Sequence, residues 1–204
     1  MTRTLVIDTA TAACSVALID RGSLIAEMYD VVGRGHAERL MPMIAALPDG
    51  GRADAILVDC GPGSFTGVRV GLAAARALGL AWNVPVHGYS SMALLAVSAD
   101  TDNGSVGVAL TGGHGELFVQ RFARNPFDSL TPLESLPPPL AATAVADNIV
   151  VGSGAAALVA ARGHGHAVEQ FPRASDATLL APAFAALPPR PIYGRDADAK
   201  PAAA

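Results

Sequence analysis

Lysine is almost absent from this sequence, and charged residues in general are scarce. Among its 204 residues, Lys200 is the single lysine, and charged residues make up 16%. A phosphate loop of the Walker type needs a lysine after its glycines, so this class of NTPase is excluded. The formal charge of −4 and the lack of any basic run also exclude general electrostatic attraction to nucleic acid or anionic membranes.

Cysteines and long apolar runs are also rare. The two cysteines, Cys14 and Cys60, lie in or at the end of expected strands, which favours buried, reduced thiols over a disulfide. A membrane span needs about 20 consecutive apolar residues, and the best window, residues 67–86, is interrupted by Arg69 and Arg76. The first ten residues lead into a strand and do not resemble a signal peptide. We therefore expect a cytoplasmic protein with no membrane contact.

The residues that are abundant indicate a well-buried α/β fold. Hydrophobic residues make up 51% of the chain, and much of that share is alanine, which lets helices pack closely. Alternating and helical periodicities predict two lobes of mixed sheet flanked by helices, at residues 1–100 and 101–204. The expected strands are residues 4–8, 13–19, 23–29, 55–59, 85–87, 106–110, 116–122 and 149–151, and the expected helices are residues 36–47, 67–82, 91–97, 155–161 and 175–187.

Two regions near the carboxyl end of the chain are expected to be less regular. Residues 125–139 hold five prolines, which predicts an extended crossover without regular structure. From Pro188 onward we expect a tail, ordered near residues 191–193 and frayed after them.

The stretch from residue 59 to 82 is the one around which the chain is organised. A strand passes through a glycine-rich turn, GPGSFTG, into the longest helical pattern in the sequence. The turn could hold an anion on free backbone N–H groups, although turn geometry alone also explains its glycines. In the helix, Gly67, Gly71 and Ala75 recur at helical spacing, and each interior glycine costs about 1 kcal/mol relative to alanine. This cost indicates that another backbone lies close.

Residues suited to catalysis are few. Asp8 and Thr9 end the first strand, where a phosphate or Mg²⁺ ligand could lie, although a hydrogen-bonded turn explains them equally well. His36 has no second ligand one turn on, because residue 40 is leucine, so a metal site is disfavoured. Ser64 lacks a histidine placed by motif to activate it. His164 and His166 lie in a glycine-flanked loop that we interpret as a solvated surface.

Three segments resemble the TsaB/YeaZ family of bacterial tRNA threonylcarbamoyladenosine biosynthesis proteins. The matching stretches are LVIDTATAACSVAL, GHAERLMPMI and GPGSFTGVRVGLAAARALGLAWNVPVHGYSSMALLA, with weaker similarity in GELFVQRF, VVGSGA and PIYGRDA. The resemblance implies a two-lobed fold of the actin, sugar-kinase and Hsp70 type with a reduced second lobe. It also implies a non-catalytic paralogue of TsaD, the subunit that transfers a threonylcarbamoyl group to ANN-decoding tRNAs.

The resemblance further implies the partners. The chain would form a heterodimer with TsaD and a homodimer in isolation, and the ATPase TsaE would join the TsaD complex. It would reach tRNA only through that complex. No cofactor is expected to bind firmly to this chain, and ATP or ADP would lie near the interface with TsaD.

The residues assigned by the resemblance fall into two sets. The expected partner interface is on the helices at residues 36–47 and 67–82 and comprises His36, Leu40, Met43, Gly67, Val68, Gly71, Leu72 and Ala75. The expected nucleotide-proximal residues are Asp8, Thr9, Gly61, Gly63, Ser64 and Thr66. No residue is assigned a catalytic role or a role as metal ligand.

The chain also departs from the family pattern. Residues 111–114 read TGGH where relatives carry a charged turn, and Cys60 replaces an expected arginine. These lost charges favour a scaffold over an enzyme. The alternative that stays open is a phosphotransferase or ATPase of the same fold, which would use Asp8 and a second carboxylate such as Asp54 or Asp59. A metallopeptidase is disfavoured because its metal ligands are lacking.

Overall fold

The first of two sheets is built from the strands expected at the start of the chain. In the computed structural model, which describes residues 3–194, this sheet has the order β3-β2-β1-β4-β5. The first three strands form an antiparallel meander, and the last two run parallel to β1. Their bounds are β1 (Arg3–Asp8), β2 (Ala13–Asp20), β3 (Ser23–Val31), β4 (Ala55–Asp59) and β5 (Val86–Tyr89).

The second sheet has the order β11-β10-β6-β7-β8, and β9 also pairs with β7. It again combines an antiparallel pair, β6 and β7, with parallel strands, β10 and β11. The bounds are β6 (Ser105–Thr111), β7 (Leu117–Arg124), β8 (Phe127–Ser129), β9 (Glu134–Leu136), β10 (Ile149–Val151) and β11 (His166–Val168).

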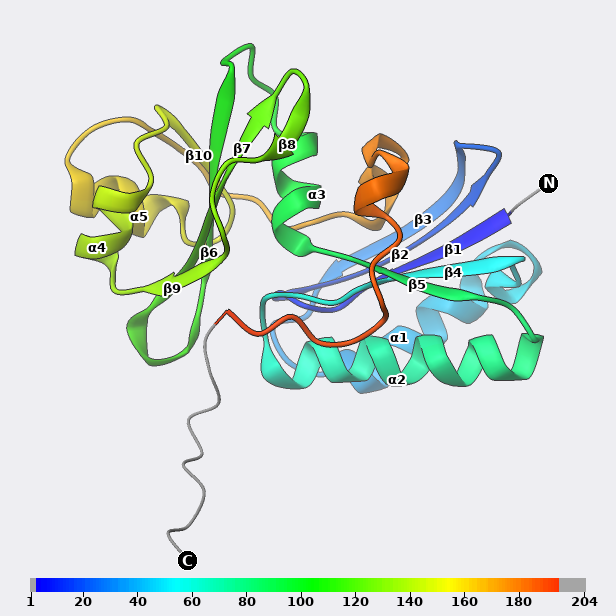
Figure 1. The fold of residues 1–204 in the computed structure, drawn as a ribbon. Coiled ribbons are helices and arrows are strands. Elements are labelled where there is room, and N and C mark those ends of the chain that lie inside the picture. Colours follow the sequence, from blue (N-terminus) through cyan, green and yellow to red (C-terminus); the bar gives the residue numbers. More distant parts are fainter. Residues whose placement is uncertain (1–2, 195–204) are drawn as a thin grey trace, which may run out of the picture.

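Helices cover both sheets and also separate them. Figure 1 shows α1 and α2 beneath the first sheet, α3 between the two sheets, and α4 and α5 on the far side of the second. The helices are α1 (His36–Ala46), α2 (Phe65–Trp82), α3 (Ser91–Ser98), α4 (Pro138–Ala144) and α5 (Ala155–Arg162), and the 3₁₀ turns are η1 (Pro48–Gly51), η2 (Gly113–Gly115), η3 (Ala174–Leu179) and η4 (Pro182–Phe184). The two-lobed mixed α/β architecture is therefore confirmed.

The alternation of side chains along the strands creates three separate cores. On β1, Leu5 and Ile7 face α1 and α2, whereas Val6 faces α3. On β6, Val108 faces α3 and Ala109 faces α4 and α5. The middle helix α3 is apolar on all sides because it contributes to the core shared by both sheets.

The helix predicted at residues 175–187 is wrong. Two short 3₁₀ turns, η3 and η4, occupy this stretch, with the chain extended at Leu180 and Ala181 between them. Pro182 explains the difference, because proline has no N–H to donate and its ring clashes with the carbonyl four residues earlier.

The expectation of no regular structure at residues 125–139 is also wrong. The segment contains β8 and β9, which pair with β7, and it ends in the first residues of α4. Its prolines lie at positions that tolerate them, with Pro126 and Pro132 outside the strands and Pro138 in the first turn of α4.

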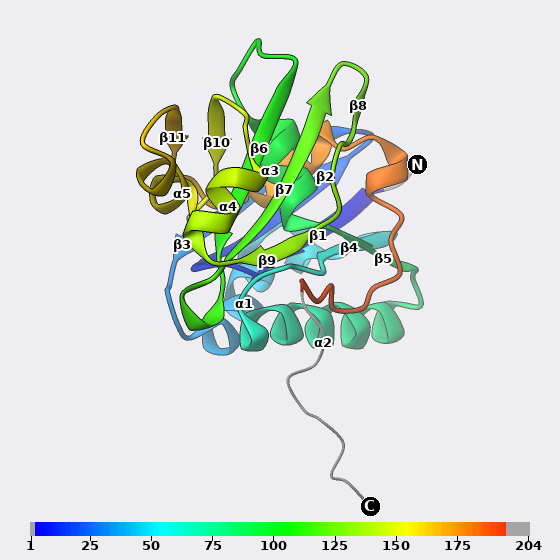
Figure 2. The same ribbon diagram turned by 60° about the vertical axis from the view of Figure 1, so that its left-hand side comes forward.

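The end of the described chain returns to the first sheet. Gly88 and Leu187 form an isolated antiparallel bridge, and the Ile192 N–H donates to the Cys60 carbonyl at 2.8 Å. Figure 2 shows this last segment alongside α2, below the first sheet. The order expected at residues 191–193 is thus confirmed, and the fraying expected beyond them lies outside the described residues. The division at residue 100 stays a prediction, and residues 174–192 contact the first sheet.

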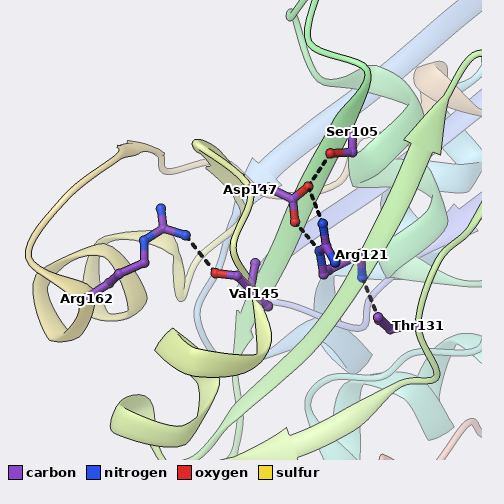
Figure 3. Close-up of polar contacts among 6 residues, drawn as sticks. All are labelled: Ser105, Arg121, Thr131, Val145, Asp147 and Arg162. Carbon is purple, nitrogen blue, oxygen red and sulfur yellow. Dashed lines mark hydrogen bonds and ion pairs between the residues drawn. The ribbon is translucent and has the colours of Figure 1, made fainter.

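A buried ion pair fixes the geometry of the second sheet. Asp147, in the loop before β10, accepts hydrogen bonds from Arg121 Nε at 2.6 Å and from the Ser105 hydroxyl (Figure 3). The Asp147 side chain is fully buried, whereas that of Arg121 is 29% exposed. The carboxylate therefore links β6, β7 and the loop that leads into β10.

Replacing Asp147 with alanine should strongly destabilise the protein. The change leaves Arg121 half-buried without its partner, and breaking a buried pair typically costs about 3 kcal/mol or more. Urea denaturation would measure the free energy of unfolding, with Asp102→Ala at an exposed position as the control. Equal stability of the two variants would contradict this role for Asp147.

Candidate functional site

The glycine-rich turn after β4 sets the start of α2. Gly61 has a φ of 91°, which favours glycine, and its N–H donates to the Asp59 carboxylate at 2.7 Å. Ser64 is the N-cap of α2, and its hydroxyl accepts from the Gly67 N–H at 3.2 Å. Ser64 therefore defines where α2 begins.

The small residues of α2 allow close contacts between this helix and other parts of the same chain. A Cβ atom on Gly63 would lie 2.0 Å from the Ala10 carbonyl oxygen, and one on Gly67 would lie 2.0 Å from the Thr9 carbonyl oxygen. One on Gly71 would lie 2.5 Å from Thr9 Oγ1. The turn between β1 and β2 thus packs directly on the helix. Contacts within the chain therefore account for the absence of a side chain at Gly67 and Gly71.

The residues expected at a partner interface are all buried within the chain. Seven of them pack between α1, α2 and the first sheet: Leu40, Met43, Gly67, Val68, Gly71, Leu72 and Ala75. The eighth, His36, is 7% exposed, and its Nε2 lies 2.9 Å from the Thr11 carbonyl oxygen. These residues position the two helices but do not present their own side chains to a partner.

The exposed faces of α1 and α2 carry a different set of residues. The two helices pack side by side on the outer face of the first sheet (Figure 1). Their exposed positions are small or apolar with few charges, and they include Met41 at 47% and Leu80 at 85% exposure. The other exposed small residues are Ala37, Pro42, Ala45, Ala46, Ala73, Ala77 and Ala81. We call this surface the α1–α2 face.

A pair of carboxyl groups is buried where β1 and β4 end. Asp8 and Asp59 are 0% and 1% exposed. The Tyr89 hydroxyl donates to Asp8 Oδ2 at 2.8 Å, and the Ser91 hydroxyl donates to Asp59 Oδ2 at 2.5 Å. Both carboxyls are therefore engaged by residues of the segment that leads from β5 into α3.

Burial governs the ionisation of this pair. Desolvation raises the pKa of Asp59 to about 6, and desolvation together with the Asp59 charge raises the pKa of Asp8 well above its usual value. Tyr89, fully buried beside them, also has a raised pKa because of desolvation and the charge of Asp8. Asp54, the other carboxylate considered, lies apart and accepts the Arg3 N–H at 3.0 Å.

A cavity of about 1120 Å³ lies between the lobes. It is lined by the turn after β1, the start of α2, the turn after β6 and the segment at residues 191–194. Of the expected nucleotide-proximal residues, Gly63 and Ser64 line this cavity. The others lie elsewhere: Asp8, Thr9 and Gly61 are buried, and Thr66 is exposed on α2.

No group of three or more metal-ligating side chains exists within residues 3–194. Over the same range, no helix is long and apolar enough to cross a membrane. Tyr89 and Ser91, which engage the two carboxyls, were not identified from the sequence. The signal was available, since both lie in GYSS directly after a strand, where polar side chains often meet those of neighbouring strand ends.

Comparisons with known proteins agree with this fold. The family described as "TsaD: tRNA N6-adenosine threonylcarbamoyltransferase" matches residues 30–130. The chain is 37% identical over 130 residues to the Escherichia coli tRNA threonylcarbamoyladenosine biosynthesis protein TsaB, which covers 60% of the chain and 56% of that protein. An uncharacterised Mycobacterium tuberculosis protein is 45% identical over 95 residues, covering 43% of the chain and 45% of the relative. The matched part thus spans about half the length of these curated relatives.

Solved structures extend the likeness over nearly the whole chain. A crystal structure described as an uncharacterised protein with similarity to peptidase YeaZ from Pseudomonas aeruginosa superposes with a TM-score of 0.80 at 29% identity. The match covers 96% of this chain and 100% of that one. YeaZ from Pseudomonas aeruginosa gives 0.73 at 29% identity over 85% of this chain and 88% of its own.

The fold and the buried pair of carboxyl groups together define the class of protein. The chain has a two-lobed mixed α/β fold, and its two strand-end carboxyls are buried and hydrogen-bonded. Within that class, the chain is similar to proteins of the TsaB/YeaZ family.

The buried carboxyls predict a protein that loses stability as the pH rises. Because the pKa of each acid is higher in the folded state than in the unfolded chain, the folded state retains protons above pH 4. The free energy of unfolding should then fall by about 1.4 kcal/mol per pH unit for each retained proton. Thermal melts from pH 5 to pH 8 measure the slope.

Asp8→Asn should make this slope shallower, since the amide has no proton to lose and can still accept from Tyr89. Asp128→Asn, at an exposed position, should keep the full slope. The same slope in both variants would contradict the assignment to the buried pair.

Proposed function

We propose that this chain is a non-catalytic subunit in tRNA threonylcarbamoyladenosine biosynthesis that binds TsaD through the α1–α2 face. The observation that carries the proposal is the combination of this exposed, sparsely charged helix pair with a carboxyl pair closed to solvent. The relatives named TsaB supply the pathway, and the family match over residues 30–130 connects the chain to the TsaD type of fold.

The composition of the α1–α2 face supports close packing of helices. Alanines at residues 45, 73 and 77 present no bulk, so a facing helix can approach to about 8 Å between axes. Met41 and Leu80 contribute apolar area at the same surface. The buried residues beneath, among them Leu40, Met43, Val68 and Leu72, hold the two helices in register.

The proposed binding to TsaD also suggests the oligomeric state, the other partners and the location of the chain. When TsaD is absent, the same face would join two copies of the chain, because the α1–α2 face could pack against either TsaD or a second copy. TsaE would join through the TsaD complex, tRNA would be bound only by that complex, and ATP or ADP would lie near the interface. We place this assembly in the cytoplasm.

The alternative of an ATPase or phosphotransferase gains no support from the described residues. Such an enzyme needs a solvent-accessible carboxylate to hold Mg²⁺ or to act as a base. Asp8 and Asp59 are buried and hydrogen-bonded to Tyr89 and Ser91. No residue between 3 and 194 completes a cluster of metal ligands that would support a peptidase.

Ala77→Arg should weaken association with TsaD at least tenfold while leaving the fold intact. The residue is exposed on α2, so the arginine projects into the proposed interface without entering the core. The mass of the complex in a mixture with TsaD measures association, and a thermal melt checks the fold. Ala157→Arg, an equivalent change at an exposed position of α5 in the other lobe, is the matched control.

Unchanged association of Ala77→Arg, or equal loss in both variants, would overturn the proposed surface. Gly71→Arg would not test this surface, because a Cβ atom at residue 71 would lie 2.5 Å from Thr9 Oγ1 and the substitution would disrupt the fold.

A further inference from the structure

The cavity between the lobes is a separate feature from the α1–α2 face. Its volume of about 1120 Å³ is at the upper end of the range that holds small organic ligands. Segments from both lobes line it, and the stretch at Pro191–Gly194 borders it on one side. The proposed partner surface does not use this cavity, so the two can be tested independently.

Four aromatic rings contribute to the apolar part of the lining. Phe65, Phe118, Phe171 and Tyr193 all border the cavity and come from four different segments of the chain. Rings arranged around a space favour a planar ligand, which they contact by offset stacking or edge-to-face packing. This lining indicates a ligand with an aromatic body.

The charged part of the lining has a single sign. Among the described residues that border the cavity, Arg69 and His114 are the basic ones, and no aspartate or glutamate is present. The Arg69 guanidinium lies 3.3 Å from the centre of the Phe65 ring. It donates to the Phe65 carbonyl at 2.9 Å and to the Tyr193 hydroxyl at 3.0 Å. These contacts orient the guanidinium and use two of its five N–H donors, so others remain for an anion.

The same lining does not fit a magnesium nucleotide. A magnesium ion bound with phosphates takes one or two protein carboxylates, and the two strand-end carboxyls, Asp8 and Asp59, are buried and do not line the cavity. One arginine balances one negative charge, whereas a nucleoside triphosphate carries several.

We propose that this cavity binds a small organic anion with an aromatic body and one negative charge, such as a carboxylate or sulfonate. Arg69 pairs with the anionic group, and the rings of Phe65, Phe118 and Tyr193 pack on the ligand body. The ligand requires no metal ion.

A pair of fluorescent probes that differ by one charge tests this proposal. 1-Anilinonaphthalene-8-sulfonate carries the aromatic body and one sulfonate, and N-phenyl-1-naphthylamine has the same body without the charge. Fluorescence titration of the full chain should show one site for each. Arg69→Gln should weaken binding of the sulfonate about tenfold and leave the uncharged probe unchanged.

Two further variants locate the site. Ala12→Trp, in the lining, should reduce binding of both probes at least tenfold, and Leu80→Ser, on the α1–α2 face, should change neither. If Ala12→Trp fails to fold by thermal melt, Gly113→Trp replaces it, because a Cβ there meets no atom within 4 Å.

Loss of binding in Leu80→Ser with full binding in Arg69→Gln would overturn the proposal, since the probes would then bind the helix face. If Arg69→Gln weakened the binding of both probes equally, the role assigned to the Arg69 charge would be overturned. Displacement of the sulfonate probe by micromolar Mg-ATP, but not by ATP in EDTA, would overturn the assigned ligand class.

Discussion

The close contact between the β1–β2 turn and the start of α2 is the constraint on which the rest of this structure depends. The Ser64 N–H donates to the Ala10 carbonyl at 2.6 Å, and the Thr9 hydroxyl donates to the Gly67 carbonyl at 2.7 Å. Such an approach leaves no room for side chains at Gly63 or Gly67. It fixes α2 against the first sheet, which in turn sets the exposed α1–α2 face and one wall of the cavity between the lobes.

The buried carboxyl pair shows how a site of this fold type is closed. Asp8 and Asp59 lie at the carboxyl ends of neighbouring parallel strands, where side chains of open sheets usually meet ligands. Here Tyr89 and Ser91 occupy their hydrogen-bonding positions, and desolvation favours the protonated forms. These polar groups thus join β1 to the end of β5, and β4 to the start of α3, the helix between the two sheets.

Much of the fold could be predicted from the sequence because its signals are local. The meander, the strand before the glycine turn and the helices α1 and α2 follow from alternation and helical spacing. The helix predicted at residues 175–187 failed at Pro182, and the pairing of β8 and β9 with β7 was missed because long-range pairing has no local signature.

The candidate site was harder to predict than the fold. Small residues in α2 correctly indicated a nearby backbone, but spacing alone does not reveal whether that backbone belongs to a partner or to the chain itself. The exposed positions of α1 and α2 depend on how each helix is rotated on the sheet. Arg69 and Tyr193, which border the cavity together, are far apart in the sequence, and no motif connects them.

The most direct test of this account is the effect of Gly67→Ala on stability. Alanine is the better helix former by about 1 kcal/mol, so a glycine kept for a ligand or partner should yield a more stable isolated chain when replaced. The contact with Thr9 predicts the opposite, a loss of about 1–3 kcal/mol in the free energy of unfolding from overpacking. Gly113→Ala, where the added methyl group meets open space, should not show this loss. A Gly67→Ala variant as stable as the parent chain, or more stable, would contradict the account.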